Sequence, residues 1–229
     1  MSAALFDFGS PMPSDTLSRR CAEVLTAVAR ARALSPDLSG TTVTFPLCSV
    51  VLRARLEARQ QNAGRMVVSV AVEAAIADQP GILVGSVGIG RNEADATETA
   101  IQEWAAMVAP AIVGAVALGD RAAERYTVDG YVVYPGATGF RGAQPPWGSA
   151  EHLKLLGALR RALPVPVPGR LRAVTLTVMV ETGQPPQGEV RFDGTVAPSL
   201  WPAVQLFDWP AAASGYIFKQ FYILAPEAR

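Results

Sequence analysis

The stretch that decides the fold lies at residues 50–72 and reads VVLRARLEARQQNAGRMVVSVAV. From Leu52 to Arg59, apolar residues at even positions alternate with charged residues at odd positions. Because successive side chains of a strand point to opposite faces, this period of two predicts a strand with one apolar face and one Arg-rich face. A polar turn at residues 60–64 leads into a second alternating run at residues 66–72. The stretch therefore predicts a β-hairpin.

Outward from this hairpin, the spacing of apolar residues predicts helices and further strands. A helix is expected after Ser14 or Asp15, a second after Asn92 that Pro110 kinks or ends, and a third after Ser149 with a stripe of Leu153, Leu156, Leu159 and Leu163. Strands are expected at residues 41–45, 82–89, 131–134, 173–180, 190–192 and 216–224, and a loop at residues 34–40. The last strand is apolar on both faces, which predicts a central position in a sheet.

Hairpins connect most of these strands, and the helices are too few to alternate with them. This order favours an α+β fold with mostly antiparallel sheet and about three helices. A helix followed by a long hairpin occurs around residues 15–73 and again around residues 149–193, so two similar helix-plus-hairpin halves are a further hypothesis. We expect one domain over residues 1–229, with a possible sub-boundary in the Gly/Pro-rich loop 135–148.

The charge balance disfavours a nucleic-acid partner. The chain has 20 basic and 20 acidic residues, whereas nucleic-acid binders usually carry a basic excess. The longest apolar run, from Trp104 to Leu118, is shorter than the roughly 20 residues that cross a bilayer, and residues 1–13 lack the basic and apolar parts of a signal peptide. We therefore expect a cytoplasmic protein that binds neither nucleic acid nor membrane. The use of 18 Arg and two Lys is typical of a GC-rich bacterial genome.

Motifs for catalysis, metal binding and nucleotide binding are not found in the sequence. The glycine cluster Gly85 to Gly90 does not have the spacing of a phosphate-binding loop, and the acidic start of the helix that follows would repel an anion. His152 is the only histidine, and at a helix start it is expected to be neutral. Cys21 and Cys48 form no C-x-x-C pair. We expect no cofactor and no metal.

A few residues remain as candidates for a binding surface. Arg53 and Arg55, with Arg59, form a basic stripe that could meet an acidic partner, although pairing with Glu73 on the next strand would neutralise part of its charge. Lys219 interrupts an apolar strand, where it could act as a base or extend to the edge of the sheet.

Tryptophans provide the other candidates. Trp147 lies in a Pro-rich loop, and Trp209 lies near Phe207. Tryptophan in a surface loop is favoured at protein interfaces, while burial under a loop is an equally good interpretation. The predicted binding surface is thus Arg53, Arg55, Trp147, Trp209 and Lys219.

Several segments resemble a known family. They are Thr127-Val-Asp-Gly-Tyr-Val-Val-Tyr-Pro-Gly136, Phe207-Asp-Trp-Pro210, Gly215-Tyr-Ile-Phe-Lys-Gln-Phe-Tyr-Ile-Leu224 and the Gly90 turn that leads into Ala100-Ile-Gln-Glu-Trp104. Together they resemble an uncharacterised bacterial family, a domain of unknown function, from about the first strand to the end of the chain. The resemblance implies an intracellular bacterial protein and brings no catalytic residues to this sequence.

The sequence therefore favours a non-catalytic protein-interaction or binding protein, one that binds another protein or a small ligand. The alternative is an enzyme or a small-ligand-binding protein whose site is dispersed along the chain, built on Lys219, Asp208 and an arginine.

Overall fold

The computed structural model describes residues 14–77, 79 and 81–227. The chain divides into two compact units between Gly119 and Asp120. Each unit contains an antiparallel sheet, and the described residues contain four α-helices, three of them longer than one or two turns. The predicted α+β class with mostly antiparallel sheet is confirmed. The loop 135–148, where a sub-boundary was predicted, lies within the second unit.

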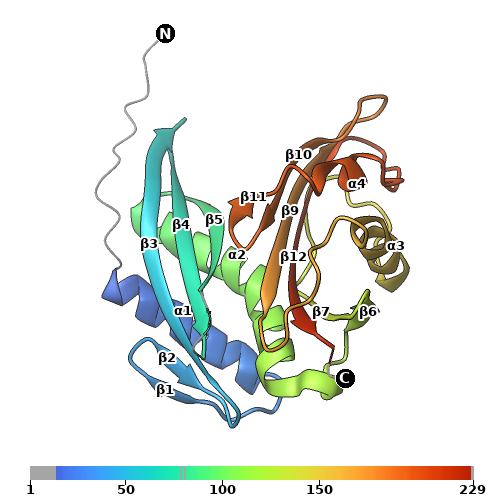
Figure 1. Ribbon diagram of the computed structural model, residues 1–229. Coiled ribbons are helices and arrows are strands. Elements are labelled where there is room, and N and C mark those ends of the chain that lie inside the picture. Colours follow the sequence, from blue (N-terminus) through green and yellow to red (C-terminus); the bar gives the residue numbers. More distant parts are fainter. Residues whose placement is uncertain (1–13, 78, 80, 228–229) are drawn as a thin grey trace. The chain divides into compact units, whose positions relative to one another are not determined.

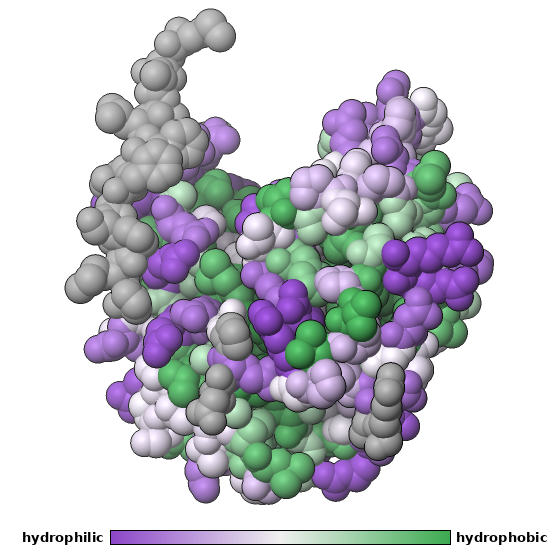
Figure 2. Space-filling model, in the orientation of Figure 1, coloured by the Kyte–Doolittle hydropathy of each residue, from purple (hydrophilic) through white to green (hydrophobic). Residues whose placement is uncertain are grey.

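The first unit is a five-stranded meander flanked in sequence by two helices. Its elements are α1 (Asp15–Arg30), β1 (Asp37–Ser39), β2 (Thr42–Thr44), β3 (Ser49–Asn62), β4 (Arg65–Ile76), β5 (Ile82–Gly90) and α2 (Glu93–Val113), with strand order β1-β2-β3-β4-β5. Figure 1 shows α1 and α2 behind the strands β3 to β5. Arg53 and Arg55 of β3 lie on the face of the sheet away from these helices. Figure 2 shows hydrophilic and hydrophobic residues intermixed over strands β3 to β5.

The hairpin predicted at residues 50–72 is confirmed as β3 and β4. Ala63 and Gly64 connect the strands with φ of 47° and 77°, the two positive φ values of a tight hairpin turn. A β-bulge between Leu56 and Ala58 shifts the register, so Arg59 pairs with Val68 on the helix side of the sheet. The prediction that Arg59 continues the face of Arg53 is therefore wrong.

Side-chain caps begin both helices of the first unit where the sequence predicts them. Ser14 Oγ accepts a hydrogen bond from Leu17 N at 3.3 Å, and Asn92 Oδ1 accepts one from Asp95 N at 2.8 Å. Pro110 does not end α2, which continues to Val113 and then into a π-helical turn, η1 (Gly114–Leu118), and a 3-10 turn, η2 (Gly119–Arg121). Packing of α2 on β4 and β5 outweighs the backbone hydrogen bond that proline removes.

The continuous helical run Glu93–Arg121 is long and apolar enough to cross a membrane by length and composition alone. Its most apolar window is 61% buried within the protein, as is common for a core helix.

The second unit is a seven-stranded sheet with helices on one face. Its elements are β6 (Tyr126–Val128), β7 (Tyr131–Pro135), β8 (Gly139–Gly142), α3 (Ser149–Leu159), β9 (Arg172–Val180), β10 (Gln187–Phe192), β11 (Thr195–Val196), α4 (Trp201–Gln205) and β12 (Tyr216–Pro226). The strand order is β11-β10-β9-β12-β7-β6, and β8 also pairs with β12. The closing strand β12 is central, as its apolar character on both faces predicts.

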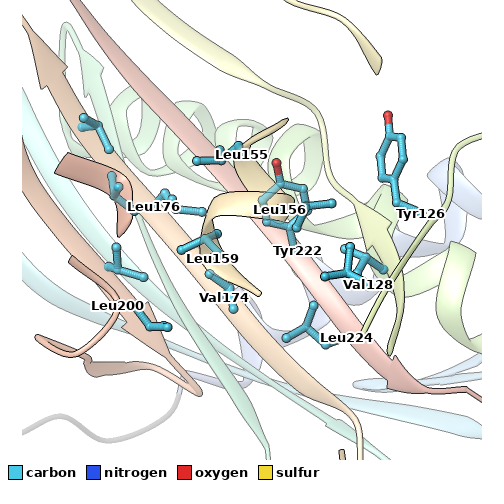
Figure 3. Close-up of a cluster of buried hydrophobic side chains, with 14 of the residues drawn as sticks. Tyr126, Val128, Leu155, Leu156, Leu159, Val174, Leu176, Leu200, Tyr222 and Leu224 are labelled. Carbon is cyan, nitrogen blue, oxygen red and sulfur yellow. The ribbon is translucent and has the colours of Figure 1, made fainter. Parts of the chain in front are cut away.

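The core of the second unit lies between α3 and the strands β9 and β12. Figure 3 shows Leu155, Leu156 and Leu159 of α3 directed towards Val174 and Tyr222 on these strands. Leu153 is 50% exposed, so the predicted stripe on this helix is wrong at its first position; His152 and Leu155 are buried instead.

Four short strands were not predicted: β1, β6, β8 and β11. Two of them follow or precede a turn with an Asp-Gly pair in the left-handed region, Asp129-Gly130 (φ 45° and 79°) and Asp193-Gly194 (φ 49° and 81°). Asp-Gly is a strong hairpin signal, so β6 and β11 were readable from sequence. By contrast, β1 lies in the predicted loop 34–40, and nothing in its three residues marks it as a strand.

Glycine in β5 lets a helix approach the sheet closely. A Cβ built on Gly88 would lie 1.9 Å from the carbonyl oxygen of Ala96 and 2.4 Å from the backbone nitrogen of Ala100, both in α2. A Cβ on Gly90 would lie 2.3 Å from the backbone nitrogen of Ala96. Gly88 and Gly90 therefore serve helix–sheet packing, which agrees with the structural role that the sequence favours over a phosphate-binding loop.

We predict that Gly88→Ala destabilises the protein by about 2–3 kcal/mol, because the clash is with backbone atoms of α2 and no side chain can move to relieve it. Urea denaturation followed by circular dichroism measures the change. Gly85→Ala on the same strand is the matched control, since a Cβ there meets no atom within 4 Å. The control is expected to leave stability unchanged or raise it by up to about 1 kcal/mol. Equal effects of the two substitutions would contradict this packing role.

Candidate functional site

Aromatic side chains from three separate segments gather on the helix side of the second sheet. Trp147 comes from the loop before α3, Phe207 and Trp209 from the segment after α4, and Phe218 from β12. The ring of Trp147 lies 4.5 Å from that of Phe218 and is stacked on that of Trp209 at 6.1 Å. The ring of Trp209 lies 5.0 Å from those of Phe207 and Phe218. We call Trp147, Leu206, Phe207 and Trp209 the aromatic face; Phe218 is its floor.

Hydrogen bonds to the interior fix both indoles of the aromatic face. Trp147 Nε1 donates to His152 Nε2 at 3.2 Å, and Trp209 Nε1 donates to the carbonyl oxygen of Val204 at 2.9 Å. The Tyr216 hydroxyl donates to the carbonyl oxygen of Pro210 at 2.9 Å and ties down the segment that carries Trp209. Since the polar atom of each indole is satisfied internally, the part of each ring that reaches the surface is apolar.

The aromatic face is partly open to solvent. Trp147, Phe207 and Trp209 are half-buried, while Leu206 is 87% exposed beside them in the chain. Such exposure is unfavourable for a leucine, and Leu206 directly precedes Phe207 in the chain. Tryptophan is one of the residue types that carry most of the binding energy at protein interfaces.

A buried imidazole lies beneath Trp147. His152, which is 5% exposed, accepts the hydrogen bond of Trp147 at Nε2, so its proton is on Nδ1, and Nδ1–H donates to the Tyr222 hydroxyl at 2.8 Å. The ring of Tyr126 stacks on the imidazole at 5.6 Å. Burial lowers the pKa of His152 to about 4, and the nearby Glu151 opposes this only weakly. His152 is therefore neutral at pH 7, as its position at a helix start predicts.

A buried glutamine completes the polar network on β12. Gln220 is fully buried; its Oε1 accepts a hydrogen bond from Thr138 Oγ1 at 2.6 Å, and its Nε2 donates to the carbonyl oxygens of Gly136 and Phe221 at 2.9 Å each. These bonds fasten the connection between β7 and β8 to the central strand. Because both ends of the amide are satisfied, Gln220 stabilises the fold rather than presenting a reactive group.

The other potentially reactive side chains are poorly suited to catalysis. Burial raises the pKa of the Cys21 thiol to about 12 and also raises the pKa of Cys48. A thiol is a nucleophile only as the thiolate, so both cysteines are weak nucleophiles at pH 7. Among the described residues, no three His, Cys, Asp or Glu side chains come together as a metal site.

The structure brings together two of the five predicted binding residues, Trp147 and Trp209. Arg53 and Arg55 lie on β3 in the first unit, and each has a carboxylate nearby. Arg53 lies 3.8 Å from Glu73, the cross-strand partner predicted for it, and Arg55 lies 3.2 Å from Glu57. The positive charge of this stripe is thus largely balanced by its neighbours.

Lys219 lies on the other face of β12 from the aromatic face. Strand residues alternate, and Phe218 packs under Trp147 and Trp209, so the side chain of Lys219 points to the opposite side of the sheet. Asp208 is exposed in the segment between Phe207 and Trp209. A dispersed site built on Lys219 and Asp208 stays a prediction.

Comparison with known proteins identifies one family that the sequence matches. Residues 40–226 match the model of a family described as Family of unknown function (DUF6348). The chain belongs to this family. The family match contains the aromatic face and the His152 network, whereas α1 and β1 precede it. No curated protein matches the sequence, and neither does any solved structure.

Two members of the site were missed by sequence reasoning. Phe218 could have been found, because it alternates with Tyr216, Tyr222 and Leu224 on one face of β12 that is apolar except for Gln220. The exposure of Leu206 has no sequence signal, since a lone leucine beside Phe207 is most often buried.

The pKa of His152 leads to a prediction for the pH dependence of stability. An unfolded histidine titrates near pH 6.5 and the folded one near pH 4, so between these values the unfolded chain binds a proton that the folded protein does not. Stability therefore falls as pH is lowered through this window, by about 1.5 kcal/mol between pH 6.5 and pH 5. Urea denaturation at a series of pH values measures it.

His152→Asn is the matched variant, because the chain has no other histidine to titrate in this range. The variant is expected to be less stable at pH 7 and to lose the pH dependence between pH 6.5 and pH 5. An NMR titration of the His152 ring should give a midpoint near pH 4. A midpoint near pH 6.5 would show that the imidazole is not held in this network.

Proposed function

We propose that this protein is a non-catalytic interaction protein that binds an apolar segment of another protein on the aromatic face. The observation that carries the proposal is the pair of stacked tryptophans, Trp147 and Trp209, held half-buried beside an exposed Leu206. Large aromatic anchors in a partly desolvated setting contribute most of the binding energy at protein interfaces.

The aromatic face is preorganised for binding. Both indole N–H groups are bonded to the interior, and the floor ring of Phe218 is fully buried on the central strand β12. Little side-chain entropy is lost when a partner packs on rings that are already fixed. The bonded indoles and the buried ring of Phe218 therefore support a binding role for the aromatic face.

The state of the potential catalytic groups supports a non-catalytic role. His152 has one ring nitrogen bonded to Trp147 and the other to Tyr222, and its pKa of about 4 makes it a weak base. A general base works best with a pKa near the operating pH. The raised pKa values of Cys21 and Cys48 also support a non-catalytic role, because they keep both thiols protonated at pH 7.

A bacterial, cytoplasmic setting is part of the proposal. It is supported by the excess of Arg over Lys and by the burial of Glu93–Arg121, the helical run among the described residues that is long and apolar enough to span a membrane. A core helix buried in this way is common in proteins that do not cross membranes.

We predict that Leu206→Glu reduces the recovery of the partner at least about tenfold when the protein is purified gently from its own host and the co-purifying proteins are quantified by mass spectrometry. A charge at this position must be desolvated against apolar partner atoms, which costs more than the lost contact alone.

Leu47→Glu is the matched control, because Leu47 is 88% exposed and Leu206 is 87% exposed, but Leu47 lies in the first unit. The control is expected to retain the partner. A partner that both variants recover equally well does not bind the aromatic face, and a co-purifying small molecule in place of a protein would favour the alternative ligand-binding role.

A further inference from the structure

One long strand edge in the first unit lacks the features that normally protect such edges. β5 has nine residues and pairs only with β4, so every second residue directs its backbone N–H and C=O away from the sheet. No other described residue forms a backbone hydrogen bond to this edge. An unpaired edge of this length is a template for another extended strand.

The other edges of the two sheets are short or protected. β1 and β6 have three residues each, β8 has four and β11 has two. The part of β3 beyond β2 is longer, but it carries a β-bulge and the charged residues Arg55, Glu57 and Arg59. Bulges and charges are the devices that keep edges from pairing with other chains.

β5 has none of these devices. Its sequence, ILVGSVGIG, contains no charged residue and no proline, and its register with β4 runs without a bulge from Ile82 to Gly90. Ile89 is 43% exposed on the face away from the helices. A strand of this kind at an edge indicates that it is paired in the functional assembly.

We propose that β5 pairs antiparallel with β5 of a second copy of the chain, joining two five-stranded sheets into one. Full overlap of nine residues in an antiparallel pair places the central residue, Ser86, on the two-fold axis and opposite itself. Leu83 then lies opposite Ile89 of the second copy, and Gly85 lies opposite Val87. A bulky pair at each end and a small–branched pair near the axis form a self-complementary surface.

The Ser86 side chain provides an independent observation for this register. Ser86 is 2% exposed, and its Oγ is buried with no hydrogen-bond partner among the described residues. An unpaired buried hydroxyl is unfavourable. Opposite residues of an antiparallel pair have Cβ atoms about 5 Å apart, so the two Ser86 hydroxyls can bond to each other across the axis. The register of full overlap therefore satisfies the one orphaned polar side chain of β5.

Sedimentation velocity of the full chain over a wide micromolar concentration range tests the proposal. The wild-type protein is expected to be in monomer–dimer equilibrium. Ile89→Lys is expected to raise the dissociation constant at least about tenfold, because the substitution acts twice across the axis. Leu38→Lys is the matched control, since Leu38 is 38% exposed on β1, the opposite edge of the same sheet, and this variant is expected to dimerise normally.

Hydrogen exchange of the wild-type protein gives a second measurement that does not depend on a variant. Protection of amides in Ile82–Gly90 should rise with protein concentration, while protection in Asp37–Ser39 should not. A monomer at every concentration, or a dimer that Ile89→Lys leaves unchanged, overturns the proposal. Leu206→Glu should not affect dimerisation, so this result is independent of the function proposed for the aromatic face.

Discussion

The His152 imidazole accepts a hydrogen bond from the indole of Trp147 and donates one to the hydroxyl of Tyr222 on the central strand, and the aromatic face depends on both bonds. Only the neutral ring can do this, because the acceptor nitrogen must lack a proton. Burial maintains that state by lowering the pKa of His152 to about 4. A loop tryptophan that could otherwise turn into solvent or collapse into the core is thus held half-buried against Phe218.

The two units provide different surfaces for binding. In the second unit, packing of α3 on β9 and β12 supplies a rigid base for the aromatic face, on which we propose that an apolar segment of another protein binds. In the first unit, Gly88 and Gly90 let α2 cover one face of β5 closely, and the edge of that strand remains available for a second copy. These two glycines of the cluster Gly85 to Gly90 thus act through packing. The positive stripe of Arg53 and Arg55 is balanced by Glu73 and Glu57, which leaves the apolar surfaces as the stronger candidates for binding.

Periodicity and capping predicted most of the fold because they depend on neighbouring residues. Alternation at residues 50–72 located β3 and β4, and Ser14 and Asn92 located the helix starts. Periodicity failed at the bulge beside Leu56, which turns Arg59 to the other face, and at β1, which is a strand only because β2 pairs with it. The candidate site was half readable: Trp147 and Trp209 stand out in sequence, whereas their stacking depends on contacts between segments far apart in the chain. The exposure of Leu206 and the orphaned hydroxyl of Ser86 are tertiary properties with no local signal.

Site-specific photo-crosslinking in the native host tests the central claim, that the aromatic face binds another protein, most directly. A benzophenone amino acid at position 206 replaces a side chain that is 87% exposed, so it is placed without disturbing the core. The account predicts one dominant protein adduct from position 206 that is absent when the same amino acid replaces Leu47. Adducts that are identical from both positions, or no protein adduct from position 206, would contradict it.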